Sequence, residues 1–130
     1  MSESPSSKSQ VFIIEDDEFL VKAYQYIFEK DGFEVLVAED GNKAMAALNG
    51  PAPSVILLDL MLPGVDGFTI LEAIGKNDRW KSVPVVILSN LSSPDNVQKG
   101  KDLGATDYLV KANTDIENVV SRVKLCLSKS

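Results

Sequence analysis

The chain has 130 residues, 45% of them hydrophobic and 25% charged, which is the size and composition of one globular domain with its own core. Its formal net charge of −6 argues against direct nucleic-acid binding, which needs clustered lysine and arginine. The chain has no histidine, which excludes Ser-His-Asp and Cys-His catalysis and the usual imidazole metal sites.

Residues 1–9 are rich in serine and contain no apolar signal core, so we predict a disordered lead there and a cytoplasmic location. The longest apolar runs, Val55–Leu58 and Val83–Leu88, are far too short to cross a bilayer, and we expect no membrane span. The single cysteine, Cys126, falls on the apolar side of the last expected helix and excludes an intrachain disulfide. Residues 10–128 are predicted to form one domain.

Short apolar runs recur along the chain and are typical of fully buried strands. They are Val11–Ile14, Val35–Ala38, Val55–Leu58 and Val85–Leu88, with a weaker one at Asp107–Val110. Segments with apolar residues at helical spacing lie between and after them. Their apolar faces are Phe19, Leu20, Ala23, Tyr24, Ile27 and Phe28; Ala44, Ala47 and Leu48; Phe68, Leu71 and Ile74; and Ile116, Val119, Val120, Val123 and Leu127.

The fourth helix, expected from Pro94 to Leu103, is mostly polar, and we predict that it is thinly packed and mobile. Thr114 and Glu117 have the spacing of a capping box at the start of the fifth helix. This regular alternation predicts an α/β fold, with a doubly wound parallel sheet of five strands and five helices on its two faces.

Polar side chains follow the strands where each strand ends. Glu15 and Asp16 follow the first, Asp59 the third, Ser89 and Asn90 the fourth, and Lys111 the fifth. In open α/β sheets the site forms beyond the carboxyl ends of the strands, so these side chains should share one rim. If the strand order is 2-1-3-4-5, the first and third strands are neighbours about 4.8 Å apart, and Asp16 faces Asp59.

Carboxylates crowded into one pocket repel each other unless a cation lies between them. Mg²⁺ fits best, because it is held by one or two carboxylates, waters and an incoming phosphate. Lys111 lies two strand spacings from Asp59, roughly 10 Å between backbones, and its long side chain can close most of that gap. The rim therefore predicts a magnesium site with Lys111 paired to Asp59 or to a phosphate on it.

Taken singly, acids at a helix start, a turn aspartate, a strand-end hydroxyl and a lysine each have a purely structural interpretation. Asp66 and Gly67 are better interpreted as turn and helix-start residues than as ligands. Four separate loops that bring site-type side chains to one rim are hard to explain by turn chemistry alone, which favours a functional site.

Four segments resemble the receiver domains of two-component response regulators, the CheY-like family: Val11–Asp17, Val55–Gly67, Val85–Ser89 and Gly104–Lys111. The likeness covers about residues 10–127 and implies the flavodoxin-like strand order 2-1-3-4-5. It also implies a phosphoacceptor switch rather than an enzyme, with at most self-catalysed phosphotransfer and autodephosphorylation. The phosphoryl donor would be a sensor histidine kinase or a phosphotransfer protein.

The same resemblance implies a role for each rim residue. Asp59 would be the phosphorylated carboxylate. Asp16 and Asp59 would bind Mg²⁺ directly, together with the main-chain carbonyl of Met61, and Glu15 would hold a metal-bound water.

The resemblance also implies how the signal leaves the site. Ser89 would hydrogen-bond the phosphoryl group, Lys111 would pair with it, and Tyr108 would be the aromatic side chain that moves on activation. A downstream effector or a fused output domain would bind the face made by the fourth helix, fifth strand and fifth helix. A phosphorylation-dependent homodimer through this face is also expected.

Some positions depart from the family pattern. Asn90 follows the switch hydroxyl, where a small residue is usual, and it could narrow access to Asp59 or add a hydrogen bond to the phosphoryl group. Ala112 follows the lysine in place of the usual proline, which argues against a cis peptide bond there. Met61 and Leu91 are apolar, and we hypothesise that they hinder attacking water and prolong the phosphorylated state.

Two other functions stay open at this point. A receiver-like docking module that works without phosphorylation is disfavoured by the intact set of Asp16, Asp59, Ser89 and Lys111. A Mg²⁺-dependent phosphohydrolase is disfavoured because its usual paired aspartates, two positions apart, are missing: position 61 is methionine.

Overall fold

The five strands of the computed structural model are β1 (Gln10–Ile14), β2 (Glu34–Ala38), β3 (Val55–Leu58), β4 (Val85–Ser89) and β5 (Asp107–Val110). They form one parallel sheet in the order β2-β1-β3-β4-β5, which confirms the predicted strand order. The structure describes residues 9–128. The predicted disordered lead over residues 1–9 therefore lies outside the described residues, except for Ser9, whose carbonyl accepts the N–H of Glu34.

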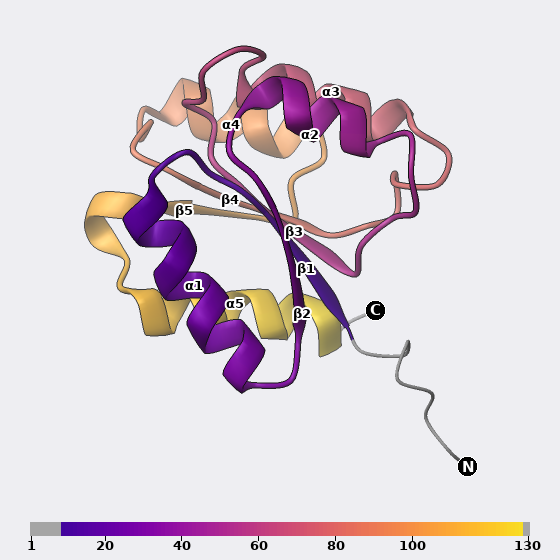
Figure 1. Cartoon of the computed structure of the whole chain (residues 1–130). Helices are drawn as coiled ribbons and strands as arrows, with labels where there is room; N and C mark the ends of the chain where they lie inside the picture. The colour runs from indigo at the N-terminus through magenta and orange to yellow at the C-terminus, as the bar shows by residue number, and fades with distance from the viewer. Residues whose placement is uncertain (1–8, 129–130) are drawn as a thin grey trace.

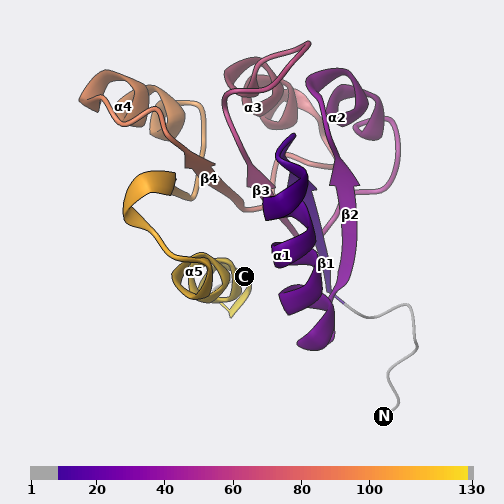
Figure 2. The same cartoon turned by 60° about the vertical axis from the view of Figure 1, so that its left-hand side comes forward.

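The helices are α1 (Glu18–Lys30), α2 (Gly41–Ala47), α3 (Gly67–Lys76), α4 (Pro94–Asp102) and α5 (Ile116–Ser128), with a 3₁₀ turn, η2 (Lys111–Asn113), before α5. Helices α1 and α5 cover one face of the sheet, and α2, α3 and α4 cover the other (Figure 1). Figure 2 shows the same layers from a second side. The α/β doubly wound fold is therefore confirmed. Over residues 9–128, no helix is long and apolar enough to cross a membrane.

Each face of the sheet has its own core, because side chains alternate between the two faces of a strand. The cluster toward α1 and α5 includes Ile13, Phe28, Leu57, Val86 and Val123, and the cluster toward α2, α3 and α4 includes Phe12, Ile14, Ile56, Ile70 and Trp80. Strands β3 and β4 are buried along their whole length. This two-sided burial explains why they are continuous apolar runs without polar alternation.

Strand β2 departs from the prediction of full burial. It lies at the edge of the sheet, where Ala38 is buried but Leu36 and Val37 are 40% and 37% exposed. A run of valine and leucine indicates a strand but does not distinguish a central from an edge position, since that depends on which strands pair. The prediction of full burial was therefore wrong for β2.

Phe19 was expected on the buried face of α1 but is 78% exposed. The buried stripe of this helix runs through Val21, Tyr24 and Phe28. Phe19 stands two residues before Val21, about 200° around the helix axis, and so points away from the sheet.

Helix α5 begins one residue later than the expected capping box places it. Asp115, not Thr114, precedes the first helical residue, and its Oδ1 accepts the N–H of Asn118 at 2.8 Å. A carboxylate in this place also interacts favourably with the positive end of the helix dipole. No peptide bond among the described residues is cis, as expected with Ala112 after the lysine.

Helix α4 is thinly packed, as predicted. Ser93 caps it, Pro94 occupies its first turn, and Gly100 is its buried residue. A Cβ at Gly100 would lie 2.9 Å from Cδ1 of Ile87 and 3.0 Å from Cδ2 of Tyr108, so only glycine allows this approach to β4 and β5. The mobility of α4 stays a prediction.

We expect Phe28→Ala to lower the free energy of unfolding by about 3–5 kcal/mol, because Phe28 is fully buried and packs edge-to-face on Phe33. Urea denaturation followed by circular dichroism measures this. The matched control is Tyr26→Ala in the same helix, which is 67% exposed and should stay within about 0.5 kcal/mol of wild type. Equal losses in both variants would contradict the core face described for α1.

Candidate functional site

The acidic residues that follow β1 and β3 meet on one rim of the sheet. These strands are direct neighbours with Ile14 opposite Leu58, and the N–H of Asp59 donates to the carbonyl of Ile14 at 3.0 Å. Glu15, Asp16 and Asp59 each offer one carboxylate oxygen, and these atoms all lie within 4.8 Å of one another. The structure thus brings Asp16 and Asp59 together, as the strand order predicts. We call these three residues the acidic rim.

Lys111 reaches the acidic rim from the end of β5. Its Nζ lies 2.9 Å from Oδ2 of Asp59 and 2.9 Å from Oε1 of Glu15. Burial acts to lower the pKa of Lys111, but the hydrogen bonds to Asp59 and Glu15 outweigh it and leave this pKa raised. Lys111 therefore stays charged. Its pairing with Glu15 was not predicted, since that contact depends on the path of the side chain across two strands.

Glu15 is only 4% exposed, and its second carboxylate oxygen accepts the N–H of Asp17 at 3.0 Å. Burial raises the pKa of Glu15, and the nearby charge of Asp59 also raises it. The hydrogen bonds from Lys111 and from the Asp17 N–H lower this pKa, but it stays above its usual value. The ionised form of Glu15 is therefore less favoured in this site than it would be in water. Asp16, in contrast, is exposed and opens the acidic rim to solvent.

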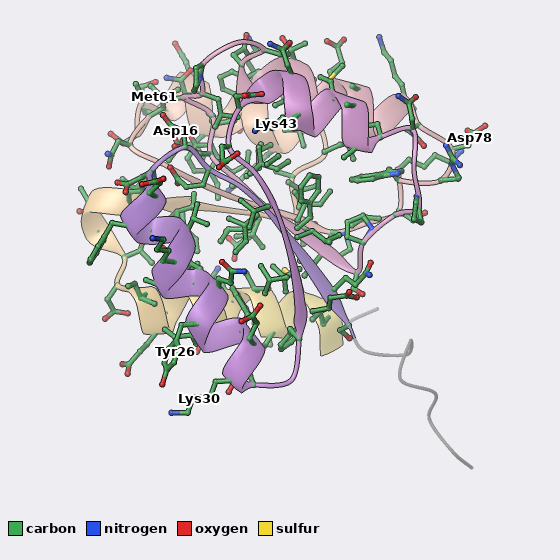
Figure 3. The ribbon with its side chains drawn as sticks, viewed as in Figure 1. Asp16, Tyr26, Lys30, Lys43, Met61 and Asp78 are labelled. Atoms are coloured by element: carbon green, nitrogen blue, oxygen red, sulfur yellow. The ribbon has the colours of Figure 1, made fainter. Side chains whose placement is uncertain are left out.

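The carboxylate of Asp59 is also oriented by the loop that follows it. The N–H of Met61 donates to its Oδ1 at 3.1 Å. A Cβ at Gly67 would lie 2.7 Å from the carbonyl oxygen of Asp59, so a side chain at position 67 would push this loop away. Asp66 caps α3 by accepting the N–H of Thr69, which confirms the interpretation of Asp66 and Gly67 as helix-start residues. Figure 3 shows Met61 and Asp16 at the same end of the sheet.

Ser89 is fully buried at the end of β4, opposite Val110 of β5. Its Oγ accepts the N–H of Leu91 at 3.3 Å. Within residues 9–128, no hydrogen bond joins Ser89 to Asp59. Asn90, which departs from the family pattern, is exposed. The structure therefore places Ser89 at the rim, but in contact with its own loop.

Tyr108 of β5 also contacts the loop that follows β4. Its hydroxyl donates to the carbonyl of Leu91 at 2.5 Å. Burial and then the charge of Asp59 raise the pKa of Tyr108, so the hydroxyl stays protonated and keeps this bond. Ser89 and Tyr108 therefore meet at the backbone of Leu91. No sequence motif marks this meeting point, because it uses only main-chain atoms of Leu91.

Tyr24 of α1 lies next to the site. The sequence predicted only that this residue belongs to the apolar face of its helix. It is 3% exposed, and burial, with a further contribution from the charge of Glu15, raises its pKa to about 12. With Lys111 it lines a pocket of about 470 Å³ between α1 and the start of α5. The phenol ring of Tyr24 therefore forms part of the wall of the pocket that Lys111 also lines.

The family model of the response regulator receiver domain matches residues 11–124. The receiver domain of the Francisella response regulator 1452 is 31% identical with a TM-score of 0.85, covering 94% of this chain and 98% of that one. The Mn²⁺-bound form of response regulator Rcp1 is 29% identical with a TM-score of 0.75, covering 92% and 90%.

Among curated proteins, the DNA-binding dual master transcriptional regulator RpaA of Synechocystis sp. is 36% identical over 93% of this chain and 50% of that protein. The chain spans about half the length of the curated relatives it matches. Family match, fold and relatives agree, and the chain belongs to the receiver domains of two-component response regulators.

Proposed function

We propose that this domain is a phosphoacceptor switch, in which Asp59 receives a phosphoryl group from a partner histidine kinase or phosphotransfer protein in a Mg²⁺-dependent reaction in the cytoplasm. The observation that carries the proposal is the acidic rim with Lys111 bound to two of its three carboxylates. Phosphoryl transfer needs positioning and neutralisation of oxygen charge more than covalent help from the protein. The domain would act at most on its own phosphorylation, and not as an enzyme on other substrates.

The residues of the rim fit a Mg²⁺ ion. They supply clustered carboxylate oxygens with one open, exposed side at Asp16, which is the donor set that this ion prefers. Asp16 and Asp59 would hold the ion directly, with the main-chain carbonyl of Met61, and Glu15 would hold a water on it. Bound there, Mg²⁺ would neutralise charge on the carboxylates and on the incoming phosphoryl oxygens.

The residues present suit transfer to Asp59. A carboxylate oxygen of Asp59 would form the new bond to phosphorus as the bond from phosphorus to the donor's nitrogen breaks. The phosphoryl group adds nearly two negative charges, so Nζ of Lys111 would follow it and leave Glu15. Ser89 accepts the Leu91 N–H with its oxygen, which leaves its own hydrogen available for a phosphoryl oxygen.

The loop after β4 would carry the change from the phosphorylation site to the output face. If Ser89 turns toward the phosphoryl group, the Leu91 backbone loses its hydrogen bond to Ser89 and can move with the carbonyl that holds Tyr108. This would bias a two-state equilibrium of α4 and β5, which the thin packing of α4 supports. An effector or a fused output domain would bind the α4-β5-α5 face, and a second phosphorylated copy could dimerise there.

The relatives suggest what the output controls. RpaA is described as a DNA-binding transcriptional regulator, and this chain matches about half of it. We infer that the output partner or fused domain of this receiver acts on transcription. The receiver itself, with a net charge of −6, would make no direct contact with nucleic acid.

The central test is phosphorylation by a small phosphodonor. Wild type with Mg²⁺ should gain the mass of one phosphoryl group, and Asp59→Asn or a chelator should abolish the gain. The matched control is Asp66→Asn, which should keep the gain because asparagine caps α3 as well as aspartate does. A wild-type protein that gains no mass would favour the alternative, a docking module that works without phosphate.

The buried Glu15 carboxylate predicts a pH-dependent cost in the metal-free protein. Because the pKa of Glu15 is raised above 4.5, the folded state holds its proton more tightly, and stability falls as pH rises through this raised pKa. Glu15→Gln should therefore be more stable than wild type at about pH 7, with the advantage gone below about pH 4. Urea titrations at several pH values measure this. Adding Mg²⁺ should stabilise wild type more than the variant; an equal effect would contradict metal binding at Glu15.

Met61→Asn should shorten the life of phosphorylated Asp59, because the exposed thioether beside the rim is replaced by an amide that can hold attacking water. Loss of the phosphoryl group after removal of the donor, followed by mass spectrometry, gives the lifetime. Tyr26→Asn, which changes an exposed residue on α1, is the control. An unchanged lifetime in Met61→Asn would count against a role of this side chain.

A further inference from the structure

Helix α4 is joined to α3 by a contact between a cation and an aromatic ring. Nζ of Lys99 in α4 lies 4.5 Å from the centre of the Phe68 ring in α3. This distance is inside the limit of about 6 Å within which the face of a ring attracts a positive charge. Both helices lie on the same face of the sheet (Figure 2). We call the pair of Lys99 and Phe68 the α3–α4 clasp.

The ring is the partner that the structure gives to the charge of Lys99. Among residues 9–128, no carboxylate forms an ion pair with Lys99. Lys99 is exposed, and Phe68 is half-buried against the core on this face of the sheet. The clasp therefore lies at the edge of the core, where water reaches the ammonium group but not the whole ring.

The two helices that the clasp joins are anchored to different extents. The first residue of α3, Gly67, lies against the loop after β3, and its N–H donates to the carbonyl of Leu60 at 3.0 Å. Helix α4, all of whose residues are described, buries only Gly100. The buried residues of α3 are Gly67, Ile70, Leu71 and Ile74. A single contact at the edge of α4 therefore supplies a large share of what holds this helix in place.

The clasp also lies beside the loop through which the proposed switch acts. A groove of about 410 Å³ between α3 and α4 is lined by Phe68, Lys99 and Leu91, among others. Leu91 belongs to the loop after β4, where its N–H donates to Ser89 and its carbonyl accepts from Tyr108. A shift of this loop would therefore change the space in which the lysine and the ring meet.

We propose that the α3–α4 clasp holds α4 in the position of the unphosphorylated domain, so that the strength of the clasp sets how readily the switch turns on. This inference rests on the proposed function, in which phosphorylation shifts an equilibrium of α4 and β5. Lys99 and Phe68 are positioning residues, which act through α4 and not on Asp59. Loss of an exposed contact of this kind changes such an equilibrium about two- to fivefold.

The first test is hydrogen exchange of the α4 backbone amides in the unphosphorylated protein. Lys99→Met removes the charge but keeps a side chain of similar length, and Phe68→Leu removes the ring but keeps an apolar residue. Each change should speed the exchange of α4 about two- to fivefold. Lys99→Arg should restore the wild-type rate, because arginine also places a cation over the ring.

The matched control is Lys101→Met. Lys101 is a second exposed lysine in the last turn of α4, but it does not line the groove. Both lysine changes remove one positive charge from the same end of the helix dipole, so the contact with the ring distinguishes them. Lys101→Met should leave the exchange of α4 close to the wild-type rate. The double variant K99M/F68L should exchange no faster than the single variants, since each removes the same contact.

The second test is the initial rate at which a small phosphodonor with Mg²⁺ adds mass to Asp59. Lys99→Met and Phe68→Leu should react about two- to fivefold faster than wild type, because the competent position of α4 is populated more often. Lys101→Met should react at the wild-type rate.

The outcomes separate the clasp from the proposed function. Equal α4 exchange in Lys99→Met and Lys101→Met, additive effects in the double variant, or faster exchange without faster phosphorylation would overturn the clasp, even if wild type is phosphorylated normally. A wild-type protein that gains no mass would instead overturn the proposed function, and with it the role of the clasp in a switch.

Discussion

The charge imbalance around Lys111 is the constraint on which the site depends. One ammonium group faces two buried carboxylates, and a third carboxylate, Asp16, lies within 4.8 Å on the solvent side. Parallel pairing of β1 and β3 forces this crowding, because the residues that follow the two strands leave the sheet side by side. The hydrophobic cores on the two faces of the sheet fix the strands, and so hold the carboxylates closer together than they would lie in water. A bound cation and a phosphoryl group are the chemistry that such a rim suits.

The backbone of Leu91 connects Ser89 at the rim with Tyr108 of β5. It donates to Ser89 and accepts from Tyr108, so two side chains on neighbouring strands depend on one loop residue. Beyond Tyr108 lies α4, where only the missing side chain of Gly100 allows close packing. Gly100 is the buried residue of α4, so few buried side chains hold this helix against β4 and β5. The physical basis of the proposed switch is this short path through main-chain atoms.

The two edges of the sheet are built differently. At β5, α4 packs closely over Tyr108, and Asp107 pairs with Arg122 of α5 at 2.7 Å. At β2, Leu36 and Val37 are partly exposed and line a hollow together with Lys43 of α2. Strands β1, β3 and β4 separate the two edges. The two edges of the sheet therefore present different surfaces.

The sequence by itself determined the α/β class, the five strands and the polar residues that end them, because apolar runs and the side chains after them are local patterns. It also predicted that Asp16 meets Asp59, once the family resemblance supplied the strand order. Only the tertiary structure decided that Leu36 is exposed and that Lys111 also binds Glu15. Burial and ion pairing depend on which elements become neighbours and on the path of long side chains between them, and neither is written in local spacing.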